Sequence, residues 1–381
     1  CSSDLQILLL SYTNRAVDEI CKSLASIAPA VDFIRVGSEL SCDEAYRGHL
    51  IENELSSCNR RSEVYERIRN CRIIVGTVAA ISGKPELFRL KHFDVAIIDE
   101  ATQILEPQLL GILCARGEDG KDAIDKFVLI GDHKQLPAVV QQNTEQSAIY
   151  DESLLSIGLT NLKDSLFERL YRNCTATVHR SYDMLCRQGR MHPEVALFAN
   201  RAFYGGRLIP VGLPHQIESS DTICRLAFYP SVPEKAGASA KINYSEARIV
   251  ADLAVRIYED HQTDFDESRT LGIITPYRSQ IALIKKEIES LGIPALNRIL
   301  VDTVERFQGS ERDVIIYSFC VNYPYQLKFL SNLTEEEGVL IDRKLNVALT
   351  RARKQMFITG VPELLERNPL YKSLLKLIES F

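Results

Sequence analysis

Long hydrophobic runs are missing from the sequence. No apolar stretch approaches the length of about 18 residues that a membrane-spanning helix needs, and the longest runs, such as ILLL and VAII, have the length of a strand. The first residues, CSSDLQILLLSYTN, also lack the basic region that opens a secretion signal. These absences predict a soluble protein without a membrane contact, located in the cytoplasm or, alternatively, in the nucleus.

Zinc-binding cysteine patterns are absent as well. The ten cysteines form no C-x-x-C pair, and no His pair stands near them at zinc spacing. Without such a site, the cysteines are expected to be buried apolar thiols in a reducing, intracellular compartment.

The sequence also lacks an excess of positive charge. Lys and Arg number 45 against 51 Asp and Glu, which gives a formal charge of −6. Bulk attraction to a phosphate backbone is therefore missing, and any contact with nucleic acid has to come from a local basic surface. The 45% hydrophobic and 25% charged residues are ordinary for a globular protein and exclude a coiled coil or a disordered tail.

Short apolar runs alternate with helical patterns along the chain. A length of 381 residues suggests two domains of about 150 residues each. Strands are expected at residues 6–11, 32–36, 72–77, 94–99 and 127–132 and, after a restart near 242, at 271–275, 298–303, 313–319 and 355–359. This alternation predicts α/β domains with parallel sheets covered on both faces. We expect a first domain at 1–178, with a helical insertion at 38–70 and with Asn14 capping a helix, and a second domain at 179–381.

Two carboxylates, Asp99 and Glu100, follow the strand at 94–99 in the string DEATQ. Ligands of open α/β sheets bind at the carboxyl edge of the strands. A carboxylate pair there can divide two tasks, one holding Mg²⁺ through its water shell and the other orienting or deprotonating an attacking water. The alternative is that the pair only begins a loop or caps a helix.

The string GDHKQLP follows the strand at 127–132 and is expected at the same edge. Gly131 permits a tight turn, and Gln135 offers both a donor and an acceptor to a phosphate or a water. Taken alone, the string is compatible with any polar loop between a strand and a helix. A second polar motif at a strand end makes a shared site the better interpretation.

The second half of the chain supplies cations. Arg190 lies in GRMHP, and Arg351 and Arg353 lie in LNVALTRAR. An arginine can grip phosphate with two parallel hydrogen bonds and suits the charge that develops during phosphoryl transfer. The alternative for each arginine is a surface ion pair with a local acid. Gln308, Gly309 and Glu311, in FQGSERD, precede another buried strand and could reach the same site.

Seven motifs in this order carry a resemblance to superfamily one helicases: SYTNRAVDEI, DEATQ, GDHKQLP, GRMHP with FYGGRL, GIITPYRSQ, VDTVERFQGSERD and LNVALTRAR. The sequence is most similar to the branch of the Upf-type and Dna2-type helicases, with an AAA_11/AAA_12-type core. The resemblance implies an α/β fold of two RecA-like domains, each a mostly parallel sheet flanked by helices. It also implies a motor that hydrolyses ATP with Mg²⁺ in the cleft between them and steps along single-stranded nucleic acid, usually 5′ to 3′.

The resemblance also implies roles for single residues around the nucleotide. Asp99 would serve Mg²⁺ through water, Glu100 would be the catalytic base, and Gln135 would sense the γ-phosphate. Arg190 and Arg351 would be arginine fingers. The remaining nucleotide-binding residues would be Glu311, Gln308, Gly309, Asp132 and Arg353.

Contacts to the nucleic acid strand would come from hydroxyls, an amide and a stacking ring, which hold phosphates and bases without reading sequence. The matching residues are Thr13, Asn14, Thr77, Thr275, Pro276, Tyr277 and Thr303. For Thr13 and Asn14, plain helix capping is the alternative. Because a motor releases its track at each step, a narrow groove on a protein of charge −6 is adequate.

The sequence departs from the family in one major respect. No window fits the phosphate-binding pattern G-x-x-x-x-G-K-[ST]. We therefore expect a fragment of a longer helicase, with a truncated first domain, possible upstream domains or protein partners, and little ATPase activity on its own. A smaller departure is Gly189, where relatives often carry a tyrosine that can stack on adenine.

The leading hypothesis is thus an ATP-dependent helicase core, with DNA favoured over RNA as the track and DNA repair as the process. One alternative is an RNA helicase of the same branch. The other is a degenerate motor that binds nucleic acid or protein as a scaffold. The intact DEATQ string, Gln135, Arg190 and Arg351 argue against degeneration, since a scaffold has no need to retain them.

Overall fold

The computed structural model describes residues 4–27, 31–176, 181–218, 223–234, 239–336 and 338–381. The chain divides into two compact units, and each is described by itself. The first comprises Cys1–His133 and Pro137–Asp183, and the second comprises Lys134–Leu136 and Met184–Phe381. The boundary predicted at residue 178 falls outside the described residues. Among the helices of the described ranges, none combines the length and the apolar character that a membrane span requires.

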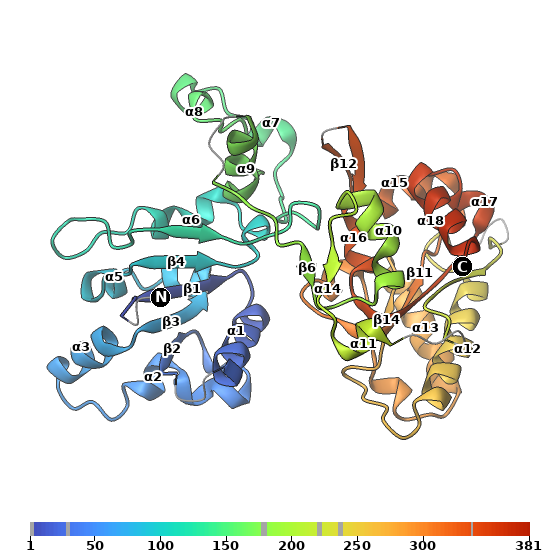
Figure 1. Cartoon of the computed structure of the whole chain (residues 1–381), viewed down its shortest axis with the longest axis horizontal. Helices are drawn as coiled ribbons and strands as arrows, with labels where there is room; N and C mark the ends of the chain where they lie inside the picture. The colour runs from blue at the N-terminus through green and yellow to red at the C-terminus, as the bar shows by residue number, and fades with distance from the viewer. Residues whose placement is uncertain (1–3, 28–30, 177–180, 219–222, 235–238, 337) are drawn as a thin grey trace. The chain divides into compact units, whose positions relative to one another are not determined.

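The first unit is built on a parallel five-stranded sheet in the order β2-β3-β1-β4-β5 (Figure 1). Its strands are β1 Ile7–Ser11, β2 Phe33–Val36, β3 Ile73–Thr77, β4 Val95–Ile98 and β5 Phe127–Leu129. Each strand lies in one of the predicted apolar runs, so the parallel α/β class is confirmed for this unit.

Helices cover both faces of this sheet. The helices are α1 Asn14–Ile27, α2 Ile51–Glu54, α3 Arg61–Asn70, α4 Val78–Ser82, α5 Glu86–Leu90, α6 Glu106–Leu113, α7 Thr144–Ser147, α8 Glu152–Ser156 and α9 Leu166–Ala176, with 3₁₀ helices at Glu39–Ser41, Glu44–His49 and Ala101–Gln103. Val17 of α1 packs with Val75 on one face, and Leu8 and Ile74 pack with Leu109 of α6 on the other. Successive strand residues thus point into opposite cores, as strand geometry requires.

The second unit has its own parallel five-stranded sheet, in the order β10-β9-β11-β14-β8. Its strands are β8 Leu226–Pro230, β9 Leu271–Ile274, β10 Leu300–Asp302, β11 Arg312–Ser318 and β14 Ala352–Gly360, and two small sheets add β6 Arg187–Gln188 with β7 Ile209–Pro210 and β12 Leu333–Glu336 with β13 Val339–Asp342. The predicted central strands are confirmed. The edge strand β8 was not predicted, because LAFYP is short and ends in a proline.

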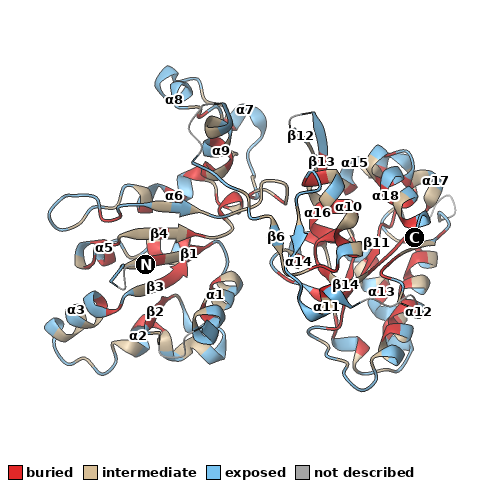
Figure 2. Cartoon of the chain, in the orientation of Figure 1, coloured by how far each residue is buried: buried red, intermediate tan, exposed pale blue. Residues whose placement is uncertain are grey.

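Helices cover both faces of the second sheet too. They are α10 Pro193–Phe203, α11 Pro214–Ile217, α12 Tyr244–Asp260, α13 Arg278–Ser290, α14 Val304–Phe307, α15 Leu327–Leu330, α16 Arg343–Leu349, α17 Pro362–Leu365 and α18 Pro369–Glu379, with 3₁₀ helices at Leu296–Arg298 and Pro324–Gln326. Val314 and Ile316 share a core with α12 and α13, whereas Ile315 and Tyr317 share one with α10, α16 and α18. In Figure 2 the buried colour follows these strands through the middle of the unit.

The prediction that the cysteines are buried was wrong for part of the set. Of the nine described cysteines, Cys114 and Cys224 are exposed, and three are half-buried: Cys58, Cys174 and Cys186. Cys114 stands at the C-terminal cap of α6 and Cys224 just before β8. Burial at such positions depends on what packs over the end of the element, and composition does not reveal this.

Candidate functional site

Asp99 and Glu100 leave the carboxyl end of β4, which lies between β1 and β5 in the sheet. The Asp99 N–H donates to the carbonyl of Leu10 at 2.8 Å, which fixes the exit of the chain from the sheet. Both side chains are half-buried. Burial raises the pKa of Asp99, and the N–H of Glu100 opposes that shift in part. The predicted carboxylate pair therefore lies at the predicted edge, partly withdrawn from water.

Glu100 has a strained backbone. Its φ of 54° and ψ of 35° lie in the left-handed region, and it is one of two non-glycine residues with a positive φ in the described chain. Its carboxylate accepts a hydrogen bond from Nε2 of Gln103 at 2.6 Å. Backbone strain that the surroundings maintain gathers at functional sites. Gln103 has no predicted role, although its place in DEATQ could have suggested one.

Gly131 brings the second strand-end motif against the first. A Cβ at this position would lie 2.9 Å from Cγ2 of Thr102 and 3.1 Å from its backbone N, so no side chain fits without a shift. Next to it, the Ala101 N–H donates to the carbonyl of Ile130 at 2.8 Å. Asp132, which follows Gly131, is half-buried. The beginning of the second motif thus adjoins the first motif within the first unit, as predicted from the edge that they share.

Gln135 belongs by its contacts to the second unit. Nζ of Lys134 donates to the carbonyl of Phe203 at 2.7 Å, and Nδ2 of Asn346 donates to the carbonyl of Lys134 at 2.8 Å. Leu136 is buried in the second unit's core. Gln135 was expected at the sheet edge with Asp99 and Glu100. The structure instead assigns Lys134–Leu136 to the unit that carries the arginines.

Arg351 is the most buried of the predicted arginines, with 2% of its surface exposed. Its Nη2 donates to Oε1 of Gln135 at 3.1 Å and to Oγ1 of Thr350 at 3.0 Å. Its Nε donates to the carbonyl of Val347 at 3.1 Å. Two predicted site residues far apart in the sequence, Gln135 and Arg351, are therefore hydrogen-bonded to each other.

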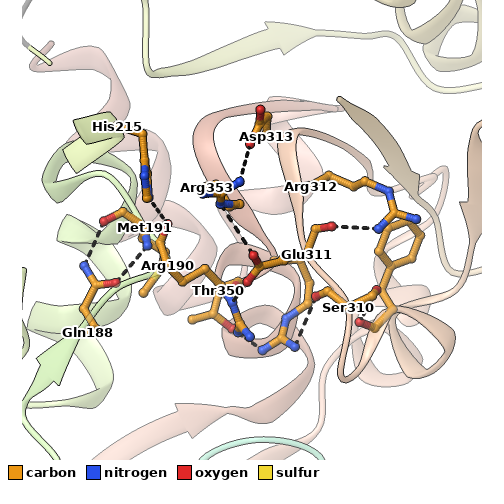
Figure 3. A network of polar contacts seen from close by, with 12 residues as sticks. Gln188, Arg190, Met191, His215, Ser310, Glu311, Arg312, Asp313, Thr350 and Arg353 are labelled. Atoms are coloured by element: carbon orange, nitrogen blue, oxygen red, sulfur yellow. Dashed lines mark hydrogen bonds and ion pairs between the residues drawn. The ribbon is translucent and has the colours of Figure 1, made fainter. Parts of the chain in front are cut away.

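Glu311 lies between two of the predicted arginines (Figure 3). Its carboxylate accepts from Nε of Arg190 at 2.7 Å and lies 3.5 Å from Nε of Arg353. Burial alone would raise the pKa of Glu311, but the hydrogen bond from Arg190 and the charges of the arginines outweigh it and lower that pKa. Arg353 also donates to Asp313 at 2.9 Å, an acid without a predicted role.

Gln308 and Gly309 form the turn that precedes Glu311. Gly309 has a φ of 76°, which favours glycine. Nε2 of Gln308 is buried and has no hydrogen-bond partner among the residues that the structure describes. A buried amide without a partner is costly, and a ligand would satisfy it.

In the first unit, residues that were predicted to contact the nucleic acid strand cap helices. Oγ1 of Thr13 accepts from the N–H of Ala16 at 3.2 Å, so Thr13 caps α1. Asn14, predicted as the cap, is instead the first helical residue. Oγ1 of Thr77 accepts from the N–H of Ala80 at 3.1 Å and caps α4. The capping alternative therefore describes Thr13, and the same role holds for Thr77.

In the second unit, the residues predicted to contact the nucleic acid strand lie just after the carboxyl ends of β9 and β10. Thr275 is fully buried, and its Oγ1 has no partner among the described residues. Pro276 and Tyr277 follow it and are half-buried, and the Tyr277 hydroxyl accepts from Nε2 of Gln326 at 3.1 Å. Thr303 is half-buried ahead of α14.

A magnesium ion suits the carboxylate pair by its chemistry. Magnesium prefers oxygen ligands and keeps several waters, so one or two carboxylates together with substrate phosphates suffice to bind it. Asp99 and Glu100 offer such oxygens at one strand end. No group of three or more acidic, His or Cys side chains that could hold a metal occurs in the described ranges.

Two parallel sheets, each with helices on both faces, define the class of α/β proteins with parallel sheets. Comparison with known proteins narrows the class. Two family models, both described as "AAA domain", match the chain: AAA_12 over residues 162–363, more than half of it, and AAA_11 over residues 51–143.

Curated relatives agree with the family models. The chain is 31% identical over 375 residues to the DNA replication ATP-dependent helicase/nuclease DNA2 of Gallus gallus, which aligns with 97% of this chain and 33% of that protein. It is 30% identical to the Xenopus laevis protein of the same name, with 95% of this chain and 33% of that protein aligned. The chain thus spans about a third of the length of these relatives.

A more distant relative and a solved structure were also found. The probable helicase MAGATAMA 3 of Arabidopsis thaliana is 28% identical, over 98% of this chain and 46% of that protein. The complex of the arterivirus nonstructural protein 10 helicase with DNA superposes with a TM-score of 0.46 at 13% identity, over 97% of this chain and 56% of that chain. The chain belongs to the superfamily one helicases, as a nucleic-acid helicase core of the Dna2-like branch.

Proposed function

We propose that this helicase core hydrolyses ATP with Mg²⁺ and uses the energy to move 5′ to 3′ along single-stranded DNA. The observation that carries the proposal is the geometry of Glu100. A carboxylate on a strained turn, half-buried and held by Gln103, is suited to a general base because its position is set before the substrate arrives.

Different residues of the chain take different roles in the hydrolysis. Glu100 accepts the proton of the attacking water, and Asp99 would hold the metal ion through water. When bound, Mg²⁺ would neutralise charge on the phosphate oxygens. Arg351 and Arg190 supply positive charge for the transferring phosphoryl group, and Gln135, held by Arg351, senses the γ-phosphate.

Arg190 is the residue that we propose to change partners. With 35% of its side chain exposed, it pairs with Glu311 in this structure. A phosphate oxygen offers the same acceptor geometry as a carboxylate. Exchange of Glu311 for phosphate would free that acid to accept from a ribose hydroxyl, and the unpartnered amide of Gln308 lies in the same turn.

The test uses a polypeptide that contains this chain together with a phosphate-binding loop, because the 381 residues hold no match to one. ATP turnover should rise with single-stranded DNA, and Glu100→Gln should lower turnover at least about hundredfold while strand binding is retained. The 381 residues alone should show little turnover. Turnover by these residues alone at the rate of a complete motor, abolished by Glu100→Gln, would contradict that part of the proposal.

A second candidate function is a scaffold that binds nucleic acid or protein without hydrolysis. The absence of a phosphate-binding pattern from the 381 residues favours it. The two functions separate in the same assay, since a scaffold binds the strand but gives no turnover that depends on Glu100.

DNA is favoured over RNA because the relatives at 30% and 31% identity are named for DNA replication. Stimulation of turnover by DNA and by RNA of equal length tests the choice, and stimulation by RNA only would identify an RNA helicase. The location in the cytoplasm or nucleus and a role in DNA repair stay predictions.

A further inference from the structure

The chain makes an unusual turn at the carboxyl end of β11. Cys320, two residues beyond the strand, has a φ of 50° and is the second non-glycine residue in the described chain with a left-handed backbone. It is fully buried. This conformation costs about 1–3 kcal/mol and persists only where the surroundings impose it. The turn leads into the segment 321–326.

A buried carboxylate holds the turn from beneath. Glu246 of α12 is fully buried and accepts from the N–H of Cys320 at 2.8 Å and from Oγ of Ser318 at 2.7 Å. Nδ2 of Asn322 donates to the carbonyl of Ile242 at 2.7 Å. Buried polar groups that satisfy one another rigidify the segment that they hold. The segment 321–326 is therefore fixed to the body of the second unit.

Gln326 ties this segment to Tyr277. Its Oε1 accepts from the N–H groups of Asn322 and Tyr323, both at 2.9 Å. Its Nε2 donates to the carbonyl of Ala240 at 2.7 Å and to the Tyr277 hydroxyl at 3.1 Å. One buried side chain thus holds the end of β9 and the segment after β11 together.

Two tyrosines stand on this rigid segment. The rings of Tyr323 and Tyr325 are stacked, with centroids 5.8 Å apart and planes 13° from parallel. Tyr325 is 55% exposed, although the backbone around it is pinned by buried contacts. An exposed ring on a rigid support loses little conformational freedom when a planar ligand stacks on it.

The tyrosines lie where this fold binds ligands. β9 and β11 are hydrogen-bonded neighbours in a parallel sheet, so Tyr277 and the segment 321–326 leave the same carboxyl edge. Two exposed cations follow the tyrosines in the sequence, Arg278 directly after Tyr277 and Lys328 three residues after Tyr325. Rings combined with nearby cations are the pattern of surfaces that bind single strands, where bases stack and phosphates are neutralised.

We propose that Tyr323 and Tyr325 form a stacking platform for the unpaired bases of the single-stranded nucleic acid on which the core acts. This inference rests on the proposed function and adds two residues that no motif of the sequence pointed to. The platform recognises the π-face of a base, so it accepts any base and does not distinguish DNA from RNA.

The test compares a strand with bases and a strand without them. The 381-residue chain is titrated, without nucleotide, into fluorescent oligothymidylate and into an abasic strand of the same length, about 20 nucleotides. Tyr323→Ala with Tyr325→Ala should weaken oligothymidylate binding about tenfold or more and leave abasic binding within about twofold. Tyr325→Phe, which keeps the ring, should bind as the original chain does.

The matched control is Tyr150→Ala, which removes a tyrosine that is 81% exposed in the first unit. It should bind both strands normally. Equal oligothymidylate binding by the original chain and the double variant would overturn the platform alone, and so would an equal loss for both strands. Failure of the original chain to bind oligothymidylate would overturn the platform and the strand-binding part of the proposed function together. Absence of ATP turnover leaves the binding comparison unaffected.

Discussion

Nε2 of Gln103 lies 2.6 Å from Oε2 of Glu100, three residues back in the chain, and donates a hydrogen bond to it. The bond closes a tight 3₁₀ turn, Ala101–Gln103, around the left-handed backbone of Glu100. The carboxylate is therefore aimed by its own neighbour in sequence.

Replacement of this amide should slow hydrolysis without loss of the fold. Gln103→Ala removes the hydrogen bond that orients the Glu100 carboxylate, so turnover at saturating ATP should fall about tenfold to hundredfold while the KM for ATP changes little. The measurement is steady-state ATPase kinetics on the polypeptide with a phosphate-binding loop. Gln141→Ala, an exposed glutamine of the same unit, is the control. A rise in KM at constant turnover would show that Gln103 acts on binding instead.

The left-handed backbone of Glu100 should lower the stability of the fold, although the Glu100 side chain is needed for hydrolysis. A left-handed conformation costs an L-residue about 1–2 kcal/mol, whereas glycine adopts it freely. Glu100→Gly should therefore unfold at a higher urea concentration than Glu100→Ala, with a difference of about 1 kcal/mol, although both variants lose hydrolysis. Equal stability of the two variants would show that the strain is absent in solution.

Because Gly131 lies against Thr102, a smaller side chain at position 102 should restore part of the stability that Gly131→Ala loses. Gly131→Ala places a Cβ at 2.9 Å from Cγ2 of Thr102, and overpacking of this kind costs about 1–3 kcal/mol. Thr102→Ser removes that methyl group, so the double variant should recover part of the loss. Urea unfolding of the two single variants and the double variant gives the coupling energy. Additive losses would mean that the two motifs do not touch at this point.

Because the pKa of Glu246 is raised in the folded chain, we expect the stability of the protein to fall as pH rises. Burial raises its pKa to about 7 from the ordinary value of 4.5, and hydrogen bonds from Ser318 and Cys320 oppose the shift. Between these two values the unfolded chain releases a proton that the folded chain retains, so the free energy of unfolding falls with pH, by an amount on the order of 3 kcal/mol. The window runs from about pH 4.5 to pH 7.

Glu246→Gln tests this linkage. The amide has no proton to release, so the variant should gain stability relative to the original chain as pH rises through the window. Its Nε2 can donate to Oγ of Ser231, which lies 3.4 Å from the carboxylate. Urea unfolding at pH 5 and pH 8 gives the difference, and an unchanged gap between the two proteins at both pH values would rule out titration of Glu246.

Much of the fold could be predicted because strands buried on both faces are continuous apolar runs. RIIVGT and DVIIYSF are such runs, and each became a central strand. The edge strand β8 and the hairpin β12–β13 escaped prediction, since LAFYP ends in a proline and LTEE carries two acids. Edge positions tolerate such residues because one side of the strand has no neighbour to satisfy.

The sequence predicted which types of residue form the candidate site better than it predicted the contacts that they make. Asp99, Glu100 and Gly131 are local features of a strand end, and their positions follow from the alternation of strands and helices. Thr13 and not Asn14 caps α1, a shift of one residue that depends on where the first helical turn closes. The stacked pair Tyr323 and Tyr325 had no motif to reveal it.

The sequence by itself determined the family, the parallel sheets and the placement of carboxylates at one strand end and arginines near others, because these depend on local patterns of apolar and charged residues. Only the tertiary structure decided that Gln135 bonds to Arg351, that Glu311 lies between Arg190 and Arg353, and that a buried Glu246 supports the turn at Cys320. These contacts join residues that are distant in the sequence, and packing selects them through the hydrogen bonds that each buried polar group must find.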